Sequence, residues 1–260
     1  MASSDIALTA LLENAENVPE LYDAVRAFAQ ARQFSSFLFG VRVPVSLAKP
    51  VHFSLSGFPK EWRKHYDEAG YLRVDPVVRH ALSSSVPIFW DEIERSDALV
   101  GAFFNEAASF GLAHGVSAPI CGRRGEVGVL SLARESVIDD CEVTRFELRR
   151  EMTWFATVLH EAVSRVAFTA STHREVARLS EREKQILMWT AAGESSATIA
   201  TELGIAERTV LFHIEKAGKK MGVTGRHKIV SRAVGSGALA LNQVALQSTR
   251  ALPTTQEFSV

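Results

Sequence analysis

Glycines divide the last third of the chain into segments that are long enough only for short helices. Ser180 and Glu183 form a capping box, which predicts that a helix begins at about residue 181. Glycine commonly ends a helix, so this helix is expected to stop at Gly193 and the next one at Gly204. Short helices can bury their apolar sides only against one another. The sequence therefore predicts a small all-α domain over residues 179–242.

The third helix of this domain, expected from about residue 206, has two different faces. An inward-packing stripe at helical spacing consists of Val210, Ile214, Ala217 and Met221. The opposite face is polar and largely basic, with Arg208, Thr209, Leu211, Glu215, Lys216, Lys219 and Lys220. Residues 178–242 contain ten Lys or Arg and six Glu, a balance of +4, whereas the whole chain carries −1. This pattern predicts a helix-turn-helix that docks in the major groove of DNA, and a helical bundle with a solvated basic face is the alternative.

Residues 1–168 mix helical and strand patterns, unlike the C-terminal part. Apolar residues at helical spacing predict helices at 1–34, 58–69, 97–110 and 140–168. Apolar runs next to turn residues predict strands at 35–44, 51–55, 115–121 and 127–133, the last two forming a hairpin. Helices, strands and helices again predict an α+β domain with an antiparallel sheet. Residues 169–178 are small and polar and are interpreted as a linker, and residues 243–260 as a flexible tail.

Composition and cysteine usage exclude several classes of protein. A net charge of −1 excludes DNA binding by bulk charge, although a chain with this net charge can still have a local basic surface. Two cysteines, Cys121 and Cys141, provide neither a disulfide framework nor zinc spacing, and no metal or cofactor is expected. The sequence has no signal peptide and no apolar run of the ~18 residues that a membrane span needs. A cytoplasmic protein without membrane contact is therefore expected.

Two sets of residues carry a resemblance to a known family. Residues 179–223 resemble the DNA-binding domain of LuxR-type regulators; the matches include Glu183, Leu187, Gly193, Ile199, Ala200, Thr209, Val210, His213 and Lys219. Residues 57–90 resemble the autoinducer-binding domain of acyl-homoserine lactone receptors, most closely those of the LasR group. The residues that match the family pattern in the front half are Trp62, Tyr66, Asp75, Pro76, Trp90 and Gly115.

The resemblance implies an architecture, a ligand and partners. Residues 1–168 would form an α/β/α sandwich of the PAS/GAF type that binds the autoinducer and dimerises. Residues 179–242 would bind a double-stranded DNA operator. The chain would then be a homodimeric quorum-sensing transcription factor that responds to an N-acyl-homoserine lactone and contacts RNA polymerase, and it would not be an enzyme.

The chemistry of such a ligand suits the matching residues. A buried amide that lacks hydrogen-bond partners costs about 1–3 kcal/mol per group. In the family's pattern Asp75 accepts the amide N–H, and the Trp62 indole N–H donates to the lactone carbonyl. Tyr66 and Ser131 are candidate donors to the amide carbonyl, and Trp90 is expected to form a wall beside the ring. The acyl tail is expected to contact Leu38, Val78, Phe103, Ala107, Leu112 and Val129.

Taken alone, each of these residues also has a purely structural interpretation. Buried aromatic residues usually belong to the core, and an Asp before a Pro usually lies in a turn. Two residues depart from the LasR group: Phe58 stands where the group has tyrosine, and Val77 where it has threonine, whereas Arg63 is retained. Both changes remove a hydroxyl near the acyl head, which puts a preference for a 3-oxo chain in doubt.

Three other functions are weighed against this interpretation. The first is a solo regulator of the same build that responds to a different small apolar signal. The second is a response regulator, whose phospho-acceptor Asp, paired acidic residues and later Lys are not found in residues 1–168. The third is an enzyme in which His65, Asp75 and Ser131 form a triad or a lactonase site. It is disfavoured because the sequence has neither a Gly-x-Ser-x-Gly elbow nor a metal cluster.

Overall fold

The computed structural model describes residues 2–43, 51–122, 125–167, 179–236 and 238–239. Nearly all described residues up to Ala167 belong to one compact unit, and those from Leu179 onward belong to a second. Each unit has its own apolar core. The expected linker at 169–178 and tail at 243–260 lie outside the described residues.

The first unit is built on a five-stranded sheet. The strand order is β2 (Val51–Ser56), β1 (Ser36–Val43), β5 (Val127–Arg134), β4 (His114–Cys121) and β3 (Ile88–Phe89). β5 runs antiparallel to both β1 and β4, and β3 runs antiparallel to β4. Ser131 at the centre of β5 lies opposite Leu38 on one side and Ser117 on the other.

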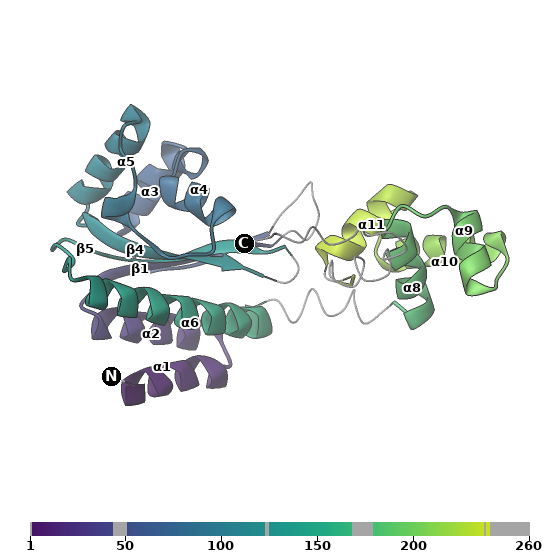
Figure 1. Ribbon diagram of the computed structural model, residues 1–260, viewed down its shortest axis with the longest axis horizontal. Coiled ribbons are helices and arrows are strands. Elements are labelled where there is room, and N and C mark those ends of the chain that lie inside the picture. The colour runs from purple at the N-terminus through teal and green to yellow at the C-terminus, as the bar shows by residue number, and fades with distance from the viewer. Residues whose placement is uncertain (1, 44–50, 123–124, 168–178, 237, 240–260) are drawn as a thin grey trace, which may run out of the picture. The chain divides into compact units, whose positions relative to one another are not determined.

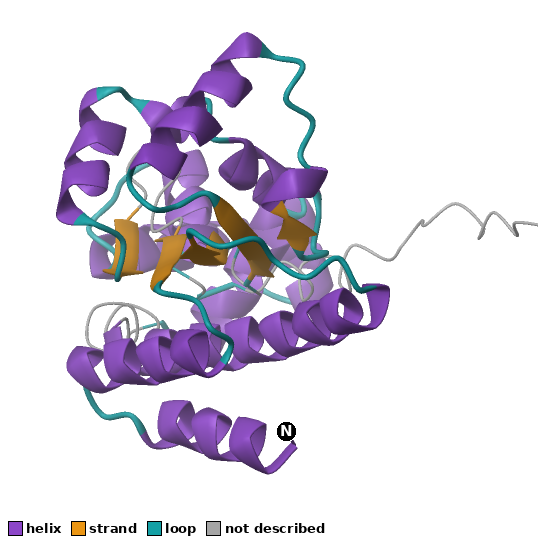
Figure 2. Ribbon diagram, turned by 90° about the vertical axis from the view of Figure 1, so that its left-hand side faces the viewer, coloured by secondary structure: helices purple, strands orange, loops and turns teal. Residues whose placement is uncertain are grey.

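Helices cover both faces of this sheet (Figures 1 and 2). One face packs against α2 (Val18–Ala31) and α6 (Glu142–Ala167), with α1 (Ala2–Asn14) outside them. The other face carries α3 (Lys60–Glu68), α4 (Pro76–Ser83) and α5 (Ala98–Ser109), together with 3-10 turns at Tyr71–Arg73 and Trp90–Glu92. The predicted α/β/α sandwich with an antiparallel sheet is confirmed.

Alternation along the strands separates two cores. On β1, Phe37, Phe39 and Val41 are buried on the side of α2 and α6. Alternate residues of a strand point to opposite faces, so Leu38 and Gly40 face α3–α5. The core on that second side consists mainly of aromatic and small residues from α3, α4 and α5.

One expectation about the helices was wrong and one helix was missed, and both have a local cause. Residues 1–34 do not form one helix, because the Asn17 side chain caps the N-terminus of α2 and Pro19 occupies its first turn. Residues 76–83 were not expected to be helical. Asp75 caps this segment and Pro76 begins it, so the Asp-Pro pair starts a helix here.

The second unit contains α8 (Glu181–Ala191), α9 (Ser196–Leu203), α10 (Glu207–Lys220) and α11 (Arg226–Gly235). The capping box is confirmed: the Ser180 hydroxyl accepts from the Glu183 N–H, and the Glu183 carboxylate accepts from the Ser180 N–H. Gly204 adopts φ 62°, a left-handed conformation that suits glycine at a helix end. The sequence patterns had not predicted α11, which packs against α10 and α8.

Candidate functional sites

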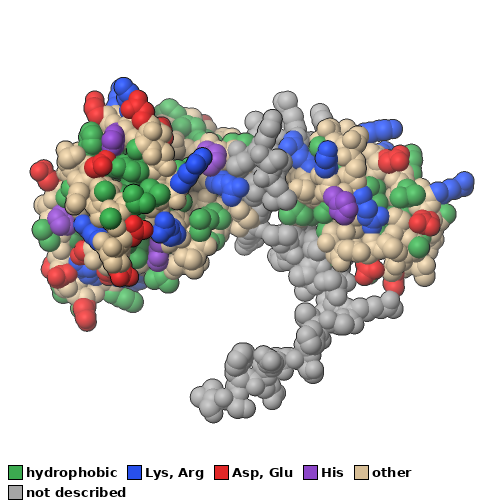
Figure 3. Space-filling view, turned by 90° about the horizontal axis from the view of Figure 1, so that it is seen from above, with side chains coloured by type: hydrophobic (Ala, Val, Ile, Leu, Met, Phe, Trp, Pro, Cys, Tyr) green, Lys and Arg blue, Asp and Glu red, His purple; other side chains and the backbone are tan. Residues whose placement is uncertain are grey.

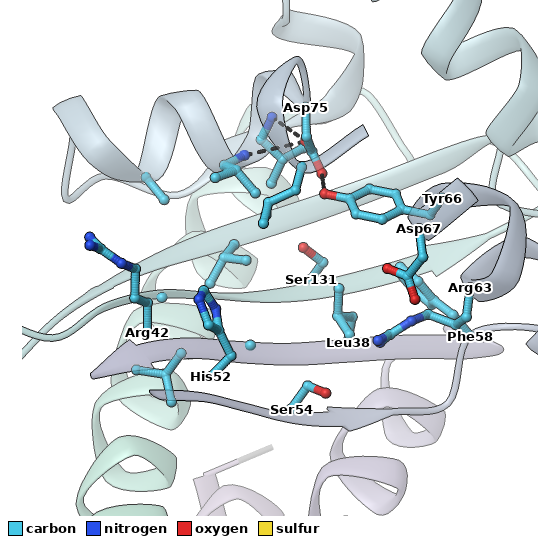
Figure 4. A pocket seen from close by; sticks show the side chains of 18 of the residues that line it. Leu38, Arg42, His52, Ser54, Phe58, Arg63, Tyr66, Asp67, Asp75 and Ser131 are labelled. Atoms are coloured by element: carbon cyan, nitrogen blue, oxygen red, sulfur yellow. Dashed lines mark hydrogen bonds between the residues drawn. The ribbon is translucent and has the colours of Figure 1, made fainter. Parts of the chain in front are cut away.

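A cavity of about 640 Å³ lies between the sheet and helices α3, α4 and α5 (Figure 4). This volume is in the range of ordinary small-molecule sites. All residues predicted to touch the ligand line it: Phe58, Trp62, Arg63, Tyr66, Asp75, Val77, Trp90, Phe103, Leu112 and Ser131. The remaining residues expected along the tail also line it, namely Leu38, Val78, Ala107 and Val129. The fold thus brings residues from α3, α4, α5, β1, β5 and the 3-10 turn at Trp90 to one cavity.

Asp75 has two roles in this geometry. Its Oδ1 accepts from the backbone N–H groups of Val77 and Val78 at 2.8 and 3.3 Å, which caps α4. Its Oδ2 accepts from the Tyr66 hydroxyl at 2.9 Å. Burial raises the pKa of Asp75, although the hydrogen bonds from Tyr66 and the two backbone groups oppose this. Both carboxylate oxygens keep a lone pair that can accept from a bound molecule.

Tyr66 serves as a hydrogen-bond donor at the wall of the cavity. Burial and the neighbouring Asp75 raise the pKa of Tyr66, so its hydroxyl stays protonated. Its one O–H bond is directed at Asp75 in this structure. To donate to a ligand carbonyl, as the family pattern implies, this hydroxyl would have to turn away from Asp75.

A buried polar chain forms the floor beneath Trp90. The Trp90 indole N–H donates to the Ser117 hydroxyl at 2.9 Å, and Ser117 Oγ lies 2.8 Å from Ser131 Oγ. Both serines are almost fully buried on the sheet. A Cβ on Gly115 would come within 2.5 Å of the Trp90 ring, so only glycine lets the indole lie flat on β4. This close approach gives a physical reason for the family's glycine at this position.

Trp62 lies in a group of aromatic rings that borders the cavity. Its ring centroid is 5.7 Å from that of Phe103, 6.0 Å from that of Tyr66 and 5.6 Å from that of Phe110. Unlike Trp90, Trp62 makes no hydrogen bond through its indole N–H to any residue that the structure describes. An indole N–H without a partner at the cavity wall is available to a bound molecule.

Sequence reasoning missed several residues of the cavity. Arg42, His52, Ser54 and Asp67 line it, and Ser117 supports its floor. Arg42 could have been found, because it continues the alternation of Leu38 and Gly40 along β1. Ser117 lies in an apolar run and offers no such signal.

The residues predicted to contact DNA come together on α10. Arg208, Leu211, Glu215, Lys216 and Lys219 are exposed, and Thr209 is half-buried. Val210, Ile214, Ala217 and Met221 are buried, as the helical stripe predicted. In Figure 3, Lys and Arg side chains project from the surface of this unit.

Lys220 contacts Glu183 more closely than does Lys216, whose Nζ lies 4.0 Å from Glu183 Oε1. The Nζ of Lys220 lies 2.7 and 2.9 Å from the two carboxylate oxygens of Glu183, whose side chain is fully buried. Burial raises the pKa of Glu183, but the bonds from Lys220 and the Ser180 N–H outweigh this and hold it below its ordinary value. Lys220 therefore ties α10 to α8, which leaves Lys219 as the freer candidate for a phosphate contact.

Comparison with known proteins agrees with both units. The model of the autoinducer binding domain matches residues 17–163, and that of the bacterial regulatory proteins of the luxR family matches residues 177–233. The chain belongs to the LuxR family of transcriptional regulators. It is 32% identical to the transcriptional activator AnoR of Acinetobacter nosocomialis over 86% of this chain and 94% of that one. It is 29% identical to LuxR of Aliivibrio fischeri over 88% and 91% of the two chains.

Solved structures lead to the same family. Escherichia coli SdiA superposes with a TM-score of 0.77 at 27% identity, covering 91% of this chain and 98% of SdiA. CepR2 of Burkholderia cenocepacia, an N-acylhomoserine lactone dependent factor, gives 0.50 at 28% identity over 61% and 93%. This LuxR-type protein thus combines an autoinducer-binding domain with a DNA-binding helix-turn-helix, and its relatives regulate transcription and are not enzymes. None of the helices in the described residues is long and apolar enough to span a membrane.

Proposed function

We propose that the cavity binds an N-acyl-homoserine lactone and that the chain, as a homodimer, couples this binding to transcription. The main support for this proposal is the composition of the cavity. It combines a buried acceptor at Asp75, an indole donor at Trp62 that no described residue satisfies, and apolar walls. An amide N–H would donate to Asp75, and the lactone carbonyl would accept from Trp62. The amide carbonyl would accept from Ser131, or from Tyr66 once its hydroxyl turns from Asp75.

The decisive experiment is expression of the full chain with a panel of lactones of four to fourteen carbons, followed by extraction of whatever co-purifies. A bound lactone should also stabilise the protein by RT ln(1 + [L]/Kd), about 2.7 kcal/mol at a hundredfold excess over Kd. The compound should be recovered intact, because a receptor does not consume it. A melting temperature that no lactone changes would contradict the proposal.

A second ligand class is supported by one observation. SdiA has been solved in complex with octanoyl-rac-glycerol, at a TM-score of 0.74 and 26% identity to this chain. That compound has an acyl chain but neither a lactone nor an amide. Phe58 and Val77 also leave the head region with fewer hydroxyl groups than the LasR group has. A monoacylglycerol in the panel would separate this solo-regulator alternative from a lactone receptor.

The exposed face of α6 is the surface we propose for homodimerisation. Val143, Phe146 and Trp154 expose 67%, 68% and 59% of their areas, and they lie on the side of α6 opposite its buried residues. A second copy is the occupant we propose, because twofold symmetry suits a helix-turn-helix that reads two half-sites. Trp154→Glu should convert a dimer to a monomer in sedimentation. Exposed Leu99→Glu is the matched control.

We propose the following division of labour along the chain. Residues 1–168 bind the ligand and dimerise, 169–178 connect, 179–242 bind DNA, and 243–260 form a tail. The operator is an inverted repeat of roughly two helical turns. Such a regulator acts in the cytoplasm, where it meets DNA and RNA polymerase.

On α10, we assign the long basic side chains to phosphate contacts and the shorter, non-basic side chains to base contacts. Lys216 and Lys219 would contact phosphate, with Arg208 near the helix start. Thr209, Leu211 and Glu215 face base edges, where Leu211 can touch a thymine methyl and Glu215 can accept from cytosine. Lys220 contributes mainly by positioning α10 through Glu183.

Two substitutions test this docking. Lys219→Ala should weaken binding to operator and scrambled DNA alike and reduce the salt slope by about 1.8 for a dimer. Glu215→Ala should mainly relax sequence preference. Both duplexes are titrated at several salt concentrations with ligand present. A Lys219→Ala variant that changes only operator selectivity would show that α10 docks differently.

A further inference from the structure

The cavity has a second polar end that the proposed ligand head does not use. Arg42 on β1 and His52 on the neighbouring β2 line this end. In Figure 4, Arg42 and His52 rise from the strands at one end, whereas Arg63 and Asp67 lie at the other, with Leu38 and Ser131 between them. The cavity thus runs from the buried polar head region to a basic end.

The basic side chains at this end have no partner among the residues that the structure describes. The cavity lining contains two carboxylates, Asp75 and Asp67. Asp75 is bonded to Tyr66 and the start of α4, and Asp67 lies at the opposite end beside Arg63. Neither Arg42 nor His52 forms an ion pair or a hydrogen bond with any residue in the described part of the chain. A guanidinium without a counterion in a ligand cavity is a ready donor to an oxygen acceptor.

The strand register gives the length of the path. Leu38 lies opposite Ser131, and Arg42 lies opposite Val127. Arg42 follows Leu38 by four residues on β1, and a strand advances by about 3.3 Å per residue. The two positions are therefore about 13 Å apart along the strand. A chain of roughly ten carbons covers this length, at about 1.3 Å of advance for each carbon–carbon bond of ~1.5 Å. Gly40 lies midway, and a Cβ added there would meet nothing within 4 Å, so the path is open.

We propose that Arg42 and His52 form a subsite for the far end of the ligand, and that this end carries an oxygen acceptor such as a carboxylate. The inference rests on the proposed function and adds to it that the signal is an acyl chain that is polar at both ends. Chain length decides whether the subsite is used, because a carboxylate that stops short of Arg42 would be buried without a partner.

Matched compounds and variants of the full chain test this subsite. The compounds are decanoyl-homoserine lactone, its analogue with a terminal carboxylate at the same length, and the same pair at hexanoyl length. Because Arg42 is exposed and water screens its charge, the parent should prefer the long carboxylate by about fivefold. At hexanoyl length the carboxylate should bind more weakly than the plain chain.

Arg42→Met should remove the preference, and Arg79→Met should retain it. Arg79 is an exposed arginine of α4 that does not line the cavity, so it controls for general charge. Gly40→Leu should weaken both decanoyl compounds and leave butanoyl-homoserine lactone unaffected. Isothermal titration measures each Kd.

The outcomes distinguish a failure of the subsite from a failure of the receptor function. If plain decanoyl lactone binds as tightly as its carboxylate, or if Arg79→Met abolishes the preference as well, the subsite is refuted while the receptor function stands. If the parent binds no lactone of any length, the proposed function and the subsite fail together. A preference that only Arg42→Met removes supports the subsite.

Discussion

The two faces of the sheet use the same strands for opposite purposes. Toward α2 and α6 the strands carry large apolar residues, and Phe28 and Phe155 stack there with ring centroids 3.7 Å apart. Toward α3, α4 and α5 they carry Gly40, Ser131 and Ser117, and a cavity remains. One face therefore supplies stability, and the other gives up close packing to make room for a ligand.

The largest expected effect compares two leucines that lie on opposite faces. Leu130→Ala removes a fully buried side chain from the packed face and should cost about 2–5 kcal/mol in unfolding free energy. Leu38→Ala removes a half-buried side chain that already borders the cavity, so it should cost less than about 1 kcal/mol, below the usual range for packed cores. Urea unfolding of the ligand-free protein measures both. Equal losses would show that the two faces do not differ in this way.

The next largest effect is on lactone affinity and concerns Asp75, the buried carboxylate on the cavity side of the sheet. Asp75→Asn keeps an acceptor for the cap of α4, because Asn suits this position as well as Asp. The loss of a charged acceptor should weaken lactone binding by roughly 1.5–3 kcal/mol, about 10–100-fold. Titration with the lactone gives the affinity, and the melting temperature of the ligand-free protein should change little. Unchanged affinity would exclude Asp75 as a ligand contact.

Asp75 and Glu183 show why one carboxylate is assigned to a ligand and the other is not. Both are buried near a helix start, yet Glu183 pairs with Lys220 whereas Asp75 pairs with no cation among the described residues. Their pKa values shift in opposite directions, with that of Asp75 raised and that of Glu183 lowered. An acid without a cation keeps its acceptors for a bound molecule.

A substitution of Ser117 tests whether the hydrogen-bonded chain of Trp90, Ser117 and Ser131 stabilises the cavity side of the sheet. Ser117→Ala leaves the buried Trp90 N–H without its partner, which should cost about 1–2 kcal/mol of unfolding free energy. Ser54→Ala, in an exposed serine lining the same cavity, should cost less than about 0.5 kcal/mol. Urea unfolding compares the two variants. If Ser117→Ala is as mild as Ser54→Ala, the Trp90 N–H has another partner or does not need one.

Local periodicity and turn chemistry predicted the α+β domain with its antiparallel sheet, the capping box at Ser180 and the buried stripe of α10. The α/β/α sandwich itself was predicted through the family resemblance. The residues around the cavity were predicted through resemblance, since aromatic spacing alone does not distinguish a core from a pocket. Pairs distant in the chain, such as Glu183 with Lys220 and Trp90 with Ser117, could not be predicted. They depend on which helices and strands meet in space.

The smallest expected effect concerns Phe58, which lines the cavity and stands where the LasR group has a tyrosine. If only a hydroxyl is missing there, Phe58→Tyr adds a donor near the ligand amide and should tighten lactone binding by about 1 kcal/mol. Phe110→Tyr, outside the cavity lining, is the matched control and should leave the affinity unchanged. Lower affinity for Phe58→Tyr would mean that the ligand already fills this space. The native signal would then differ in shape from that of the LasR group, and the cavity side of the sheet would be specific by packing as well as by hydrogen bonds.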